Sequence, residues 1–153
     1  MSDHNARTGD VTVLNTLIAT LIDSVEGYEK SAGDVENPRF SELFNSRARE
    51  RQGAVEDLRA AVRVAGGEPE DDGSVLGSAH RVFLSLKEAV TGRDDKAIVN
   101  EIERGEDYLK GKFRAALENT DLGVEARAAV QSAWDSVRAG HDEMSALKHS
   151  MDV

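Results

Sequence analysis

The 153-residue sequence contains no cysteine. This absence excludes disulfide bonds, thiolate metal sites and cysteine nucleophiles, and it is compatible with a reducing compartment. A domain of this length buries roughly two thirds of its unfolded surface, so a hydrophobic core can stabilise it without disulfide bonds. We therefore expect a cytoplasmic protein with a flexible N-terminus at residues 1–9 and a single domain at residues 10–150.

Long apolar runs and basic clusters are also absent. The longest apolar stretch, LIATLI at residues 17–22, is far shorter than the ~20 residues of a transmembrane helix. The first ten residues lack the apolar centre of a signal peptide. The net charge of −10, with no Lys/Arg cluster, would repel a phosphate backbone. The sequence thus predicts a soluble protein that binds neither membranes nor nucleic acids.

Proline occurs only twice, next to expected helix ends: Pro38 follows Asn37, and Pro69 follows two glycines. Elsewhere the apolar residues recur every three or four positions, which predicts an all-α protein. The predicted helices span residues 10–33, 38–65, 74–91, 94–118 and 122–149. Their start signals are Asp10, Asn37, Ser74, Asp94 and Asp121, and glycines at 33, 66 and 92 supply stops.

The segment 74–91 decides the predicted topology. At 1.5 Å per residue it is ~27 Å long, nearly the length of a bundle helix. It could return the chain to the start of the preceding helix, so that the helices at 38–65 and 94–118 run parallel. This is a ferritin-like four-helix bundle with a helical crossover between the second and third long helices. A five-helix up-and-down bundle is the alternative.

Each predicted long helix carries polar residues on or beside its apolar face. Arg47 and Arg51 lie in the middle of one face, and Glu106 lies within another. Glu29 falls within the apolar stripe of the first helix, and His141 flanks that of the last. Because a buried carboxylate must be paired or protonated, we expect the arginines to neutralise the acidic residues across the bundle. The predicted core polar layer is Glu29, Arg47, Arg51, Glu106 and His141.

The same acidic residues could instead hold a metal ion. A ferritin-like di-metal site takes a glutamate from each of two helices and a Glu-x-x-His pair from each of the other two. No such pair is present, since Arg138 precedes His141 at that spacing and Gly53 follows Glu50. We predict no cofactor, and the alternative is a degenerate site for iron or another divalent metal. Its candidate ligands are Glu26, Glu29, Glu50, Glu103, Glu106 and His141.

The remaining candidate residues form no constellation. His80 lies off the apolar stripe of its helix, His4 and His149 lie near the chain ends, and Trp134 reads as a residue at the edge of the core. The sequence has no Gly-rich phosphate loop, nucleophile elbow or His-Asp-Ser arrangement. We therefore predict no catalytic residues.

The stretch GGEPEDDGSVLGSAHRVFLSLKEAVTGRDDKAIVNEIERGEDYLKGKF, residues 66–113, resembles a bacterial family of ferritin-like four-helix-bundle proteins of unassigned function. The similarity extends from the first helix to GHDEMSAL in the last. Its most specific pieces are the turn at 67–69, Gly73-Ser74, His80-Arg81, the step from Glu103 to Asp107, and His141-Asp142. The resemblance implies the ferritin-like bundle with its helical crossover. It implies no activity.

The sequence favours a non-enzymatic bundle that acts through its surface or its assembly, and only the resemblance suggests a role under stress. Small residues such as Gly105, Gly111 and Gly140 would allow close helix approach, which leaves open a homo-oligomer or an unknown protein partner. A third hypothesis is an adaptor that docks an amphipathic helix, and it requires a large exposed apolar patch.

Overall fold

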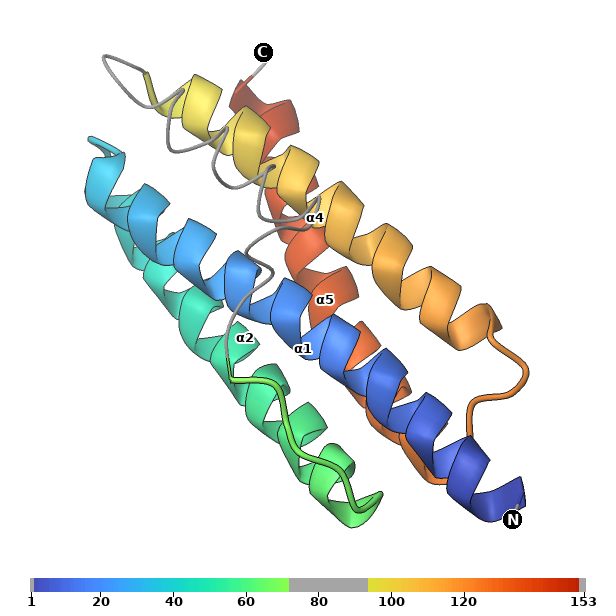
Figure 1. Cartoon of the computed structure of the whole chain (residues 1–153). Coiled ribbons are helices and arrows are strands. Elements are labelled where there is room, and N and C mark those ends of the chain that lie inside the picture. Colours follow the sequence, from blue (N-terminus) through green and yellow to red (C-terminus); the bar gives the residue numbers. More distant parts are fainter. Residues whose placement is uncertain (1, 72–93, 152–153) are drawn as a thin grey trace.

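The computed structural model describes residues 2–71 and 94–151, with side chains from Thr8 onward. Within these ranges the regular structure is helical, with no strand. The helices are α1 (Ser2–Asp34), α2 (Pro38–Val64), α4 (Asp95–Glu118) and α5 (Val124–Met151) (Figure 1). The prediction of an all-α protein is confirmed. The predicted helix at 74–91, with its signals Ser74 and Gly92, lies outside the described residues.

Two of the predicted start signals act as helix caps. The side chain of Asn37 accepts a hydrogen bond from the backbone N–H of Arg39, and that of Asp94 accepts one from Ala97. Pro38 occupies the first position of α2, where its missing N–H is not needed. At the other end of α2, Gly66 adopts a φ of 85°, a left-handed conformation that glycine favours after a helix.

The helix starts predicted from Asp10 and Asp121 were wrong. Helix α1 begins at Ser2, eight residues before the predicted start at Asp10, because residues 2–9 contain no proline that would end a helix. Asp10 lies inside α1, and its carboxylate accepts a hydrogen bond from the backbone N–H of Gly123 at 3.0 Å. Helix α5 begins only at Val124, after the predicted cap at Asp121. Asp10 therefore links α1 to the start of α5.

The termini of the helices show how the bundle is connected. The carboxylate of Asp95, the first residue of α4, accepts hydrogen bonds from the backbone N–H groups of Glu36 and Asn37 at 2.9 Å each. The starts of α2 and α4 are thus neighbours, and these two helices run in the same direction (Figure 1). The end of α2 and the start of α4 therefore lie at opposite ends of the bundle (Figure 1). Helices α2 and α4 run parallel in both the crossover bundle and the five-helix bundle. The position of residues 74–91 would distinguish these two predictions.

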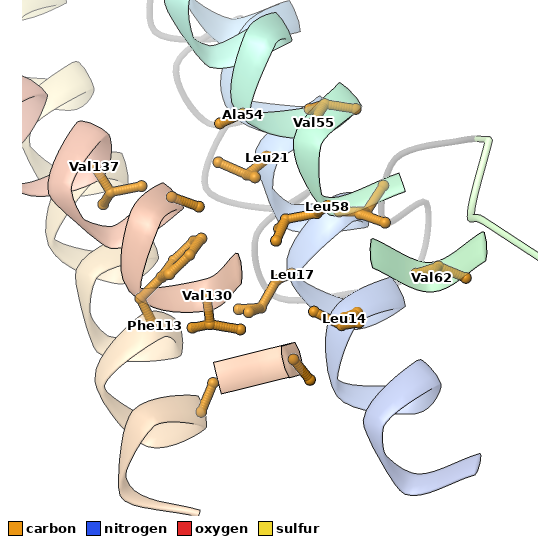
Figure 2. Close-up of a cluster of buried hydrophobic side chains, with 14 of the residues drawn as sticks. Leu14, Leu17, Leu21, Ala54, Val55, Leu58, Val62, Phe113, Val130 and Val137 are labelled. Atoms are coloured by element: carbon orange, nitrogen blue, oxygen red, sulfur yellow. The ribbon is translucent and has the colours of Figure 1, made fainter. Parts of the chain in front are cut away.

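The four helices surround a core that is divided into two hydrophobic clusters. Helix α1 packs against α2 and α4, and α5 packs against α4 and α2. The larger cluster lies toward the N-terminal end of α1 and contains Leu17, Leu58, Phe113 and Val130 (Figure 2). The smaller one lies toward the opposite end and contains Phe44, Ile102 and Met144. Polar side chains lie between the two clusters.

Among residues 2–71 and 94–151, no helix has an apolar stretch long enough to span a lipid bilayer.

Candidate functional site

A buried ion pair occupies the level between the two hydrophobic clusters. The guanidinium of Arg51 in α2 donates two hydrogen bonds to Glu106 in α4, Nη1 to Oε1 at 2.7 Å and Nη2 to Oε2 at 2.5 Å. The side chain of Arg51 is 0% exposed and that of Glu106 is 1% exposed. This bidentate geometry is the strongest pairing that two charged side chains make, and it offsets part of the cost of removing both charges from water.

Helix α1 adds two side chains to the ion pair. Arg51 Nη1 also donates to the hydroxyl of Ser24 at 2.7 Å, and the guanidinium lies 5.6 Å from the centre of the Tyr28 ring, within reach of a cation–π interaction. Tyr28 in turn packs against Phe44, with ring centres 6.0 Å apart. The ion pair is therefore surrounded by aromatic and hydroxyl groups rather than by water.

The surroundings change the proton affinities of Tyr28 and Arg51. Burial, reinforced by the nearby charge of Glu106, raises the pKa of Tyr28 well above 10.0. Burial alone would lower the pKa of Arg51, but the adjacent Glu106 carboxylate reverses the effect, and this pKa lies above its ordinary value. Tyr28 is therefore neutral and Arg51 charged at physiological pH, so neither group is suited to proton transfer.

Helix α5 contributes a glycine to this layer. A Cβ atom at Gly140 would overlap Nη2 of Arg51 and would lie 3.2 Å from both Cδ and Nε of Arg47. The bare backbone of Gly140 thus provides the space in which the two arginines lie. Since Ser24, Arg51, Glu106 and Gly140 come from α1, α2, α4 and α5, all four helices meet at the Arg51 side chain.

Arg47 lies one turn before Arg51 but pairs at the edge of the bundle. Its Nη2 donates to Glu143 Oε1 at 2.6 Å, and its Nη1 lies 2.8 Å from Glu50 Oε2. The Arg47 side chain is 9% exposed, whereas those of Glu143 and Glu50 are 39% and 47% exposed. Arg47 therefore joins the buried layer to the outer seam between α2 and α5.

The structure brings together only part of the predicted polar layer. Arg47, Arg51 and Glu106 are buried and adjacent. Glu29 is exposed, because it follows the buried Tyr28 by one helical step and so points away from the core. His141 faces the seam between α4 and α5, where its Nε2 lies 2.6 Å from Asp107 Oδ1. The predicted positions of Glu29 and His141 in the buried layer are thus corrected.

Sequence reasoning also missed members of the layer. Ser24, Tyr28 and Glu143 were not among the predicted site residues, and Gly140 was noted only for close helix approach. The one sequence signal that links Ser24 to Tyr28 is their helical spacing. Ser24 and Tyr28 are four residues apart on α1, a spacing that places two side chains on the same side of a helix.

The candidate metal ligands are dispersed. Glu26 and Glu29 are exposed on α1, and Glu103 pairs with Lys148 at 3.0 Å. Glu50 contacts Arg47, and both carboxylate oxygens of Glu106 accept hydrogen bonds from Arg51.

In the part of the chain that the structure describes, no three His, Asp or Glu side chains are grouped so that they could hold a metal ion. His80 lies outside that part, as do the side chain of His4 and its surroundings.

A second polar region lies on the outside of the bundle, along α4. A pocket of about 310 Å³ is lined by Asn100, Glu103, Arg104 and Asp107 of α4 and by Lys148 of α5. The pairs Glu103–Lys148 and Asp107–His141 join α4 to α5 at this seam. The Asp107 and Lys148 side chains are 59% and 39% exposed, in contrast to the fully buried Arg51–Glu106 pair.

A match to a known protein family covers most of the chain. A protein-family model described as a domain of unknown function, DUF2383, matches residues 10–119. The matched range contains α2, α4 and most of α1, and therefore both partners of the buried ion pair, whereas α5 follows it. A search of curated proteins gave no match.

Proposed function

We propose that this chain, which belongs to the DUF2383 family of domains of unknown function, is a non-enzymatic helical-bundle protein. It acts through its outer surface, by contacting another protein or a second copy of itself. The observation that carries this proposal is the self-neutralised Arg51–Glu106 pair, fully buried between the two hydrophobic clusters. Such a pair stabilises one packing arrangement and offers no accessible reactive group to a substrate.

The composition of the outer surface favours a polar contact. Among the described residues, only Val64 and Val124 are large hydrophobic side chains in exposed positions. Docking of an amphipathic helix onto an apolar groove therefore has little support. With a net charge of −10, the surface favours partners that present basic side chains.

The proposal can be tested by measuring association directly. Sedimentation equilibrium over a wide concentration range, repeated at high salt, would detect self-association, and chemical crosslinking in the native cell would detect a protein partner. We expect a discrete larger species in at least one experiment, and a polar contact should weaken in high salt. A chain that stays monomeric in sedimentation and forms no discrete crosslinked species would overturn the proposal.

The ferritin-like crossover is the second part of the proposal. Its support is that α2 and α4 begin at the same end of the bundle, so residues 65–94 must return along it, and a helix at 74–91 has the right length to do so. Hydrogen exchange tests this segment. We expect protected amides through 74–91, and uniformly fast exchange there would contradict a helical crossover.

A cytoplasmic location and a role under stress complete the proposal. The absence of cysteine supports a reducing compartment, and the stress role rests on the resemblance to a bacterial family alone. Fractionation of stressed and unstressed cells tests both. A protein found outside the cytoplasm, or unchanged in abundance under stress, would contradict the corresponding part.

The alternative of a degenerate metal-binding bundle has weaker support, because Arg51 already occupies both oxygens of Glu106. Elemental analysis of protein purified without an affinity tag, followed by anaerobic ferrous titration, distinguishes the two. We expect no bound metal. One or two metal ions per chain that are lost in Glu106→Ala would favour the alternative.

A further inference from the structure

Helix α5 packs unevenly along its length. Before Gly140 it contributes four buried side chains to the larger hydrophobic cluster, namely Ala126, Val130, Ala133 and Val137. After Gly140 it contributes only Met144 to the smaller cluster, while Leu147 and Met151 pack against that cluster and remain partly exposed. Because burial of apolar surface is the main favourable term in folding, the α5 end segment (residues 141–151) is anchored less strongly than the rest of the helix.

Two ion pairs of the α5 end segment lie at the outside of the bundle. Glu143 pairs with Arg47 at 2.6 Å, and Lys148 pairs with Glu103 at 3.0 Å. The Glu143 and Lys148 side chains are each 39% exposed, so water and salt can replace these partners. Arg47 has a second carboxylate within its own helix, since its Nη1 lies 2.8 Å from Glu50 Oε2. Separation of the α5 end segment therefore leaves Arg47 paired.

The buried Arg51–Glu106 pair does not depend on the α5 end segment. Its charged groups come from α2 and α4, and Ser24 of α1 adds a hydroxyl. The close contact of α5 with Arg51 is at Gly140, the only glycine of this helix. A glycine inside a helix weakens it relative to alanine. Helix α5 thus has a weak point at the boundary of its end segment, beside a charged pair that the segment does not complete.

We propose that the α5 end segment opens away from the bundle while α1, α2, α4 and the first part of α5 stay folded, with the break in the helix at Gly140. Proteins open locally where few buried apolar contacts hold a segment. In the closed bundle only Val64 and Val124, among the described residues, are exposed large hydrophobic side chains. Opening withdraws Met144 and Leu147 from the smaller cluster and so creates an apolar surface on this end of the bundle. This conformational device is independent of the contact with a protein partner proposed above.

The methionines provide a direct test of the opening. Met144 is 0% exposed and Met151 is partly exposed, and the only other methionine is Met1. Hydrogen peroxide transfers one oxygen atom to the thioether sulfur and is itself reduced to water, so mass spectrometry of the full chain in dilute peroxide reports how often each sulfur is accessible. We expect Met144 to oxidise more slowly than Met151, at a rate that low urea concentrations hardly change, because local opening exposes little surface. A Met144 rate that rises with urea as steeply as the global unfolding equilibrium constant would overturn the proposal.

Amide hydrogen exchange of the full chain defines the extent of the opening. We expect residues 144–151 to share one protection factor, at least about ten times lower than those of residues 128–139, because they are exposed in a single event. Equal protection in the two ranges, or a gradual decline toward residue 151, would contradict a break at Gly140.

Two variants separate local opening from global unfolding. Leu147→Ala removes apolar contact from the α5 end segment and should speed Met144 oxidation about three- to tenfold. Val130→Ala leaves a cavity in the larger cluster (Figure 2) and should lower the urea midpoint without changing the Met144 rate. Circular dichroism of each variant verifies the fold. No acceleration in Leu147→Ala, or an equal acceleration in Val130→Ala, would mean that the segment does not open by itself.

Discussion

Glu106 and Asp107 are adjacent in sequence, and each contacts a basic side chain of another helix, yet their surroundings differ completely. The Glu106 side chain is 1% exposed and forms a bidentate pair with Arg51. Asp107 is 59% exposed and pairs through one oxygen with His141. A rotation of about 100° per residue along α4 is enough to move one carboxylate into the core and the next into solvent.

The difference between the two pairs is mainly one of solvation. In the core, removal of one partner leaves an uncompensated charge that water cannot reach, so the cost of breaking the pair is large. At the surface, water and salt replace the lost partner, so the cost is small. The buried pair therefore governs which packing of the four helices is stable, and the exposed pair leaves its groups available to solutes and partners.

The largest expected effect comes from breaking the buried pair. Arg51→Met leaves the Glu106 carboxylate buried without a partner, and Glu106→Leu leaves the guanidinium in the same state. Each should lower the free energy of unfolding by about 3–5 kcal/mol, measured by urea denaturation. The double variant Arg51→Met/Glu106→Leu should recover most of this loss, since it buries no charge. Unchanged stability in the single variants, or additive losses in the double one, would contradict the proposed role of the pair.

A smaller loss is expected at Gly140. Alanine there would push against Arg51 and Arg47 and should cost about 1–3 kcal/mol, as overpacking of a filled core does. Gly111→Ala is the matched control, because Gly111 is an exposed residue of α4 with no atom within 4 Å of the added Cβ. That variant should gain about 0.5–1 kcal/mol from helix propensity. Equal melting temperatures for the two variants would argue against close packing at Gly140.

The raised pKa of Tyr28 predicts an effect at high pH. Because the pKa is higher in the folded chain than in the unfolded one, Tyr28 contributes its full stability below pH 10.0 and loses it as the pH rises toward the folded-state pKa. The free energy of unfolding should therefore fall as the pH rises above 10.0. Tyr28→Phe should remove this part of the decline. Tyr108→Phe replaces the other tyrosine and serves as the control. Identical alkaline profiles for both variants would contradict the assignment.

The smallest effect is expected from the exposed pair. Asp107→Asn should change the free energy of unfolding by at most about 1 kcal/mol, as exposed ion pairs do. The change should shrink at high salt, because salt screens interactions between charges at the surface. A loss as large as that of Arg51→Met would mean that the two pairs are equivalent after all.

Helical periodicity predicted three members of the buried layer, Arg47, Arg51 and Glu106, but misplaced Glu29 and His141. Arg51 and Glu106 lie inside strongly patterned apolar faces, where a small error in the assumed angle per residue still leaves their side chains directed at the core. Glu29 was predicted to lie within the apolar stripe of its helix, but the structure places it outside the core, next to the buried Tyr28. His141 flanks its face, and its ring pairs with Asp107 in the seam between helices. At such borders, periodicity cannot determine the direction of a side chain.

The ends of the helices also include both contacts that the sequence predicts and contacts that it does not. Asn37 and Asp94 were predictable as caps because their bonds are local, to backbone N–H groups two and three residues away. Asp10 belongs to the same residue class, yet its partner is Gly123, which is 113 residues distant. No local pattern encodes that contact.

The sequence by itself determined the helical class, the extents of α2 and α4 to within a residue, and the two charged residues that meet in the core. These features follow from residue spacing and local capping, which act over a few positions. Only the tertiary structure decided that Arg51 is shared by Ser24 and Glu106 beneath Gly140, and that Asp107 turns outward beside a polar pocket. Those contacts depend on how four separate helices rotate and approach one another, and close packing of the whole core fixes both.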